Sequence, residues 1–196
     1  MIKQNHNKKI YSLNILFQLF MVFVFPFHIW SFLMAFRDFD WVAKRTEIWD
    51  AIGLVSYALV FALVETMGFF VLMLLLGLLV PKSWQDEKRI ALVGTLGMAI
   101  ATWAILYEAY YLFDSPIPAI LITLCAYISH PLRVLWAGAT LVVVLSIGIP
   151  VFLIVRFDRA KKFTVEIFDR IILVSTIYLL FDIAGIIVIL IRNLRI

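Results

Sequence analysis

The chain has 196 residues, of which 64% are hydrophobic and only 15% charged, with a formal net charge of +4. Soluble domains are about half apolar and about one quarter charged, so this composition excludes an ordinary soluble domain and indicates an integral membrane protein. The basic residues lie at the ends of apolar runs, where lipid headgroups and topology account for them, so the charge does not indicate nucleic-acid binding. Cys125 is the only cysteine, which excludes an intrachain disulfide and a CxxC metal or redox site.

Five apolar segments are long enough to cross a bilayer. The hydrocarbon layer is ~30 Å thick and a helix rises ~1.5 Å per residue, so a crossing requires about 20 apolar residues. The segments that meet this requirement cover residues 12–36, 51–80, 90–113, 134–155 and 171–191. The sequence therefore predicts an all-α fold, a polytopic membrane bundle of five transmembrane helices, in one domain over residues 1–196.

The first segment follows three lysines, Lys3, Lys8 and Lys9, which is the charge pattern of a signal peptide. It is longer than the apolar region of a usual signal peptide, and no A-x-A cleavage site follows it. We interpret it as an uncleaved signal anchor, the first transmembrane helix. Pro26 lies inside this segment and is expected to kink the helix.

Residues 116–129 form a shorter apolar stretch between two prolines. Ser115 followed by Pro116 indicates a helix start, and Pro131 ends the stretch, so the predicted helix has roughly 14 residues and a length of ~21 Å. This is short for a crossing, and a re-entrant or interfacial helix is expected. A sixth short span is the alternative.

The distribution of basic residues favours five spans. With a cytoplasmic N-terminus, five spans place most Lys and Arg residues inside, whereas six spans divide them almost evenly between the two sides. Residues 37–50 then form an outer loop, in which Trp41 and Trp49 are expected to lie at the level of the headgroups. We expect a multi-pass protein of the plasma membrane.

Residues 156–170 connect the fourth and fifth spans. Phe157, Phe163 and Ile167 recur at helical spacing, which is typical of an amphipathic interfacial helix, although an ordinary cytoplasmic loop is the simpler interpretation. The basic residues of this segment could bind anionic lipid headgroups. They are Arg156, Arg159, Lys161 and Lys162.

Three acidic residues lie inside apolar spans, where carboxylates are costly and usually face a bundle interior or a wet cavity. Each acid belongs to a series of mainly small residues at helical spacing. The series are Ala58, Ala62, Glu65 and Gly68; Gly94, Gly97, Ala101, Ala104, Glu108 and Tyr111; and Ser175, Tyr178, Asp182 and Gly185. Small residues mark helix–helix contacts in membranes, so each acid is expected to face a neighbouring helix.

The five-span topology places the three acids in the outer half of the membrane, together with His28, and Arg133 on the same side. We regard these residues and two tyrosines as one candidate intramembrane polar site. Its members are Glu65, Glu108, Asp182, His28, Tyr111, Tyr178 and Arg133. The alternative is that each acid is protonated and only joins two helices through a hydrogen bond.

No motif indicates an enzyme, because HExxH, G-x-S-x-G and P-loop patterns are absent. No two histidines could ligate a haem within the membrane, and we expect no cofactor and no metal. The expected function is therefore non-enzymatic, namely the binding or passage of a small solute, ion or lipid at the polar site. The alternatives are an accessory or scaffold subunit that packs against other membrane subunits, and an intramembrane enzyme acting on a lipid-linked substrate.

Overall fold

The computed structural model describes residues 11–81, 83–113 and 116–194. The described residues form helices joined by short connections. The helices are α1 (Leu13–Arg45), α2 (Ile48–Gly77), α3 (Asp86–Leu112), α4 (Ala119–Ala126), α5 (Pro131–Arg156) and α6 (Asp158–Asn193). All except α4 are long and apolar enough to cross a membrane, so the predicted all-α fold with five spans is confirmed. The basic residues expected before the first span, Lys3, Lys8 and Lys9, lie outside the described residues.

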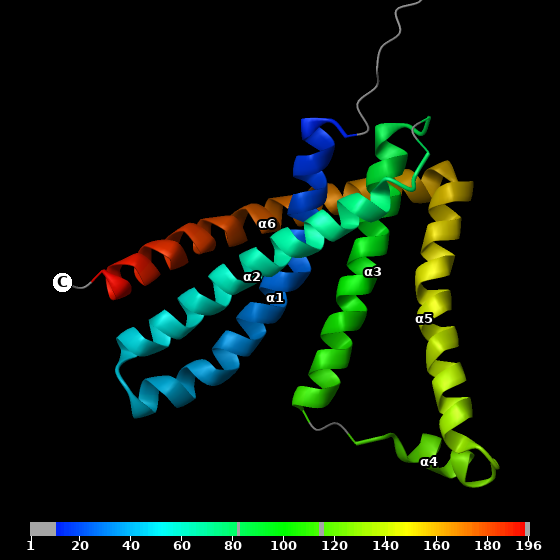
Figure 1. Ribbon diagram of the computed structural model, residues 1–196, viewed down its shortest axis with the longest axis horizontal. Coiled ribbons are helices and arrows are strands. Elements are labelled where there is room, and N and C mark those ends of the chain that lie inside the picture. The colour runs from blue at the N-terminus through cyan, green and yellow to red at the C-terminus, as the bar shows by residue number, and fades with distance from the viewer. Residues whose placement is uncertain (1–10, 82, 114–115, 195–196) are drawn as a thin grey trace, which may run out of the picture.

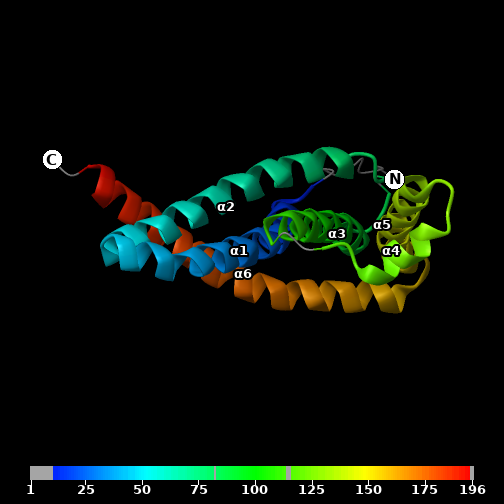
Figure 2. The same cartoon turned by 90° about the horizontal axis from the view of Figure 1, so that it is seen from below.

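Helix α1 lies at the centre of the arrangement and contacts α2, α3 and α6. Figure 2 shows α2 on one side of α1 and α6 on the other, and Figure 1 shows that α1 changes direction along its length. The helix continues through Pro26 without a break. The buried core gathers near the beginning of α1. Its members are Ile15, Leu19, Val22, Phe23, Met73, Ile90, Val93 and Phe168.

Glycines allow the aromatic residues of this core to approach α3 closely. A Cβ atom at Gly94 would overlap the ring of Phe168, and one at Gly97 would overlap the ring of Phe23. Both glycines are buried. The small residues at the beginning of α3 therefore do form a helix-packing face, as small residues do in membrane bundles.

The first connection differs from the expected outer loop. Helix α1 has 33 residues and continues to Arg45, so only Thr46 and Glu47 separate it from α2. No proline or glycine interrupts residues 37–45, and Lys44 pairs with Asp40 one turn earlier. The prediction that residues 37–50 form a loop was wrong, because hydropathy reports contact with lipid, whereas a polar segment can remain helical beyond the membrane.

The segment between the fourth and fifth spans also differs from both sequence-based interpretations. Phe157 is the only residue between α5 and α6, and α6 then runs for 36 residues without a break. The predicted interfacial helix is therefore the first part of the last spanning helix. Lys161 is buried there and lies 3.2 Å from an oxygen of Asp158 and 3.9 Å from one of Glu87, so α6 is joined to α3 by charge as well as by packing.

Helix α4 is shorter than predicted. It has eight residues, which correspond to a length of ~12 Å and cannot cross a bilayer. The six-span alternative is therefore wrong. The helix begins only after Pro118, while Ser115, the expected start signal, lies outside the described residues. Among the described helices, α4 contacts only α5, and Figure 1 shows both at the edge of the bundle.

Candidate functional site

His28 of α1 and Asp182 of α6 form a buried pair between two spans. Nε2 of His28 lies 3.0 Å from both carboxyl oxygens of Asp182, and the two residues are 0% and 1% exposed. Nδ1 of His28 lies 2.8 Å from the carbonyl oxygen of Val24. Because a carbonyl can only accept, Nδ1 carries a proton, and a single further proton is shared between Nε2 and the carboxyl group.

This arrangement keeps the buried pair electrically neutral. The pair is either an imidazolium beside a carboxylate or a neutral imidazole that accepts from a carboxylic acid, and both forms have no net charge. A lone ion would be expensive in hydrocarbon, whereas this neutral pair satisfies its hydrogen bonds within the protein. The geometry of His28 and Asp182 is therefore that of a polar clamp between α1 and α6.

The small-residue series of α6 does face its neighbours. Ser175, Asp182 and Gly185 are all buried, and the ring of Tyr178 stacks on His28 with 5.8 Å between centroids. A Cβ atom at Gly185 would lie 3.3 Å from the carbonyl oxygen of Ser56 on α2, which marks a close approach of the two helices. Within the described part of the chain, the hydroxyl of Ser175 has no hydrogen-bond partner.

Glu65 and Glu108 lie elsewhere, on the surface of α2 and α3. Both residues are exposed, and they are near enough for their charges to interact. Nε1 of Trp30 on α1 donates to Glu108 over 2.9 Å, whereas Glu65 has no hydrogen bond or ion pair with any described residue. Among the three acids, only Asp182 faces the interior as expected.

The reason for this difference is the angular position of each acid on its helix. The buried positions of α2 include Leu59, Ala62, Thr66 and Met73, so Glu65 is turned one residue away from the packed face. On α3 the predicted series is buried as far as Ala101 and exposed from Ala104 onward. The stripes of small residues therefore indicated helix contacts correctly over part of α2 and of α3. Glu65 and Glu108 themselves lie outside the packed faces and are exposed.

The remaining members of the predicted site are exposed. Tyr111 lies one turn after Glu108 and its ring contacts that of Tyr107, with 4.7 Å between centroids. Arg133 lies at the beginning of α5, beside a shallow groove of about 260 Å³ that includes Ser129 and His130. Among the described residues, no hydrogen bond or ion pair connects either residue to an acid of the predicted site.

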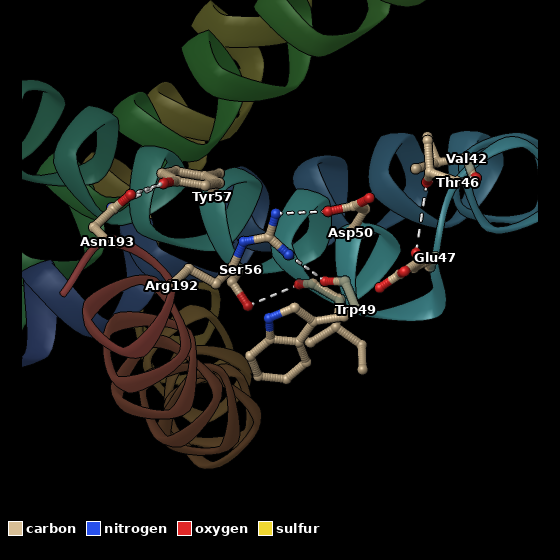
Figure 3. Close-up of polar contacts among 10 residues, drawn as sticks. Val42, Thr46, Glu47, Trp49, Asp50, Ser56, Tyr57, Arg192 and Asn193 are labelled. Carbon is tan, nitrogen blue, oxygen red and sulfur yellow. Dashed lines mark hydrogen bonds and ion pairs between the residues drawn. The ribbon is translucent and has the colours of Figure 1, made fainter. Parts of the chain in front are cut away.

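A further polar cluster was missed in the sequence. Arg192 near the end of α6 donates through Nη2 to Asp50 of α2 over 2.8 Å, and through Nη1 to the carbonyl of Trp49 (Figure 3). Beside it, Nδ2 of Asn193 donates to the hydroxyl of Tyr57 over 2.9 Å (Figure 3). The sequence does contain a signal for this cluster. Asp50 near the start of α2 and Arg192 near the end of α6 carry opposite charges, and the five-span topology places both on the same side of the membrane.

Gly53 makes the position of Arg192 possible. A Cβ atom at this residue would lie 2.7 Å from Cζ of Arg192, so the guanidinium lies directly across the backbone of α2. The side chains of Arg192 and Asp50 remain 24% and 44% exposed. The cluster therefore joins α2 to α6 while keeping part of each charged group accessible.

The described residues contain no group of three or more His, Cys, Asp or Glu side chains that could hold a metal ion. Four surface grooves among the described residues include none of Glu65, Glu108, His28 and Asp182 in their walls. Comparison with protein-family models, with curated proteins and with solved structures finds no significant match.

Proposed function

We propose that this polytopic membrane protein is a non-enzymatic subunit that binds a basic side chain of a partner membrane protein through Glu65 and Glu108. The observation that carries the proposal is that the carboxyl groups of Glu65 and Glu108 are exposed within two spans and have no cationic partner among the described residues. The buried residues His28 and Asp182, by contrast, are already hydrogen-bonded to each other.

The cost of exposing acids to lipid supports a cationic occupant. A charged side chain at the centre of a spanning helix, where Glu65 lies, costs about 2.5–3.5 kcal/mol on insertion scales, and the like charge of Glu108 adds repulsion. One arginine or lysine placed between Glu65 and Glu108 would remove the repulsion and most of the unpaired charge. Arginine fits best, because its planar guanidinium has five N–H donors and can donate two parallel hydrogen bonds to a carboxylate.

The surroundings of the two acids favour a partner within the membrane over a dissolved ion. Phe61, Val64 and Met67 are exposed beside Glu65, so the site is open toward lipid. Gly68, one turn after Glu65, would have nothing within 4 Å of an added Cβ atom. A partner helix could therefore approach α2 closely at this point, as small residues permit in membranes.

Association with a host helix tests the proposal. The protein is reconstituted in bicelles with a spanning Leu/Ala peptide that carries one central arginine, and binding is measured by resonance energy transfer against the same peptide with leucine at that position. We expect the arginine peptide to bind at least about fivefold more tightly, which corresponds to ~1 kcal/mol. The double variant Glu65→Gln/Glu108→Gln should lose this preference.

The control is Asp169→Asn, which removes an exposed carboxylate of α6 and should keep the preference. Thermal unfolding of each variant checks that the fold is retained. Equal binding of the two peptides by the unmodified protein would refute the proposal, and so would a preference that persists in the double variant.

A further inference from the structure

An apolar groove runs along the surface between α1, α2 and α6, on different faces from Glu65 and Glu108. Its volume is about 260 Å³, and its walls include Phe36 of α1, Ile52 and Leu59 of α2, and Phe181, Ala184 and Val188 of α6. These side chains are almost entirely hydrocarbon. A groove of this kind within a spanning region fits a hydrocarbon chain better than a polar ligand.

Charged groups lie at one end of the groove. Arg192 follows Val188 by one helical turn on α6, and Trp49 and Asp50 lie about one turn before Ile52 and Gly53 on α2. Figure 3 shows Arg192 between the two helices, bound to both Asp50 and the carbonyl of Trp49. The groove therefore leads from a hydrocarbon-lined region to a positive and a negative group held side by side.

We propose that this groove binds one acyl chain of a zwitterionic phospholipid whose headgroup has a phosphate and a primary ammonium. The phosphate contacts Arg192, which uses two of its five N–H donors on Asp50 and Trp49 and keeps others available. The ammonium contacts the exposed part of Asp50, since the guanidinium of Arg192 already lies 6.0 Å from the centre of the Trp49 ring.

Charge complementarity selects this headgroup. Arg192 and Asp50 carry opposite charges and together are neutral, so a headgroup with only a negative charge would be attracted by one residue and repelled by the other. A headgroup with both charges can pair with both residues. The partial exposure of Arg192 and Asp50, 24% and 44%, leaves each of them accessible for this contact.

Lipid retention measured by native mass spectrometry tests the proposal. The full chain is exchanged into mixed micelles that contain equal amounts of phosphatidylethanolamine and phosphatidylglycerol with identical acyl chains. We expect one phosphatidylethanolamine to be retained per chain, with at least about fivefold preference over phosphatidylglycerol. The variant Ala184→Trp fills the groove from an exposed position and should reduce this retention at least tenfold.

The matched control is Ala139→Trp, which adds the same ring to an exposed position of α5 away from the groove and should retain the lipid. The comparison of the two lipids uses the unmodified protein and so does not depend on the folding of any variant. Absence of a retained lipid, equal or greater retention of phosphatidylglycerol, or unchanged retention in a folded Ala184→Trp variant would each overturn the proposal.

Discussion

The buried pair of His28 and Asp182 makes a sharp prediction, because two substitutions at Asp182 should differ in their effect. Asparagine keeps a hydrogen bond to the histidine. Nδ1 of His28 still donates to Val24, and the neutral Nε2 accepts from the asparagine amide. Alanine removes the partner and leaves Nε2 buried without a hydrogen bond.

The expected magnitudes follow from these two geometries. An unsatisfied buried polar group costs about 1–3 kcal/mol, so Asp182→Ala should lower the free energy of unfolding by that amount. Asp182→Asn preserves volume, neutrality and one hydrogen bond, and should cost less than about 1 kcal/mol. Hydrogen bonds between helices in membranes average about 0.6 kcal/mol and reach about 1.7, so the coupling of His28 to Asp182 should lie within that range.

The assay is reversible unfolding in mixed micelles with increasing dodecyl sulfate, followed by circular dichroism. The variants His28→Ala, Asp182→Ala and the double variant give a double-mutant cycle, from which the coupling free energy is obtained. The reasoning would be refuted if Asp182→Asn destabilised the protein as much as Asp182→Ala, or if the coupling were zero within error.

Three further substitutions test the packing by the same unfolding assay. Gly97→Ala should cost about 1–3 kcal/mol, because its Cβ atom would overlap a core ring. Gly138→Ala on α5 has open space and should not destabilise the protein, since alanine favours a helix by up to about 1 kcal/mol over glycine. Equal effects would contradict the described core. Gly53→Ala should retain the fold but displace the guanidinium of Arg192. A double-mutant cycle between Arg192 and Asp50 should then give a smaller coupling free energy than in the unmodified chain. An unchanged coupling would argue against the close approach of Arg192 to Gly53. Trp30→Phe removes one hydrogen bond to α3 and should lower the free energy of unfolding by about 0.6 kcal/mol. A decrease above about 2 kcal/mol would show that the indole ring stabilises the fold by more than this hydrogen bond.

The number of spans could be predicted from the sequence, whereas several helix ends could not. The hydropathy of a segment indicates whether that segment is long and apolar enough to cross the bilayer. This property can be read from each segment separately. It says nothing about residues beyond the membrane. For that reason residues 37–45 and 158–170 were not recognised as continuations of α1 and α6, although they lack internal prolines and glycines.

The sequence indicated residue types for a candidate site but not how those residues are arranged. Periodicity assigns Asp182 and Glu65 to faces of their helices, yet it does not say which faces are covered. His28 and Asp182 are 154 positions apart in the chain, and their contact depends on how α1 lies against α6. The same holds for Arg192 and Asp50, which meet only because Gly53 allows the guanidinium to cross α2.

The sequence by itself thus determined that this is an all-helical membrane protein with five spans and with acids inside them, because the cost of placing polar groups in hydrocarbon acts on each segment separately. Only the tertiary structure decided that Asp182 is satisfied by His28, while Glu65 and Glu108 lie exposed on α2 and α3. That distinction depends on which helices approach one another and through which faces. Helix packing in lipid is set by close contacts between distant segments rather than by hydrophobic pattern, since lipid tails are as apolar as the side chains of the helices.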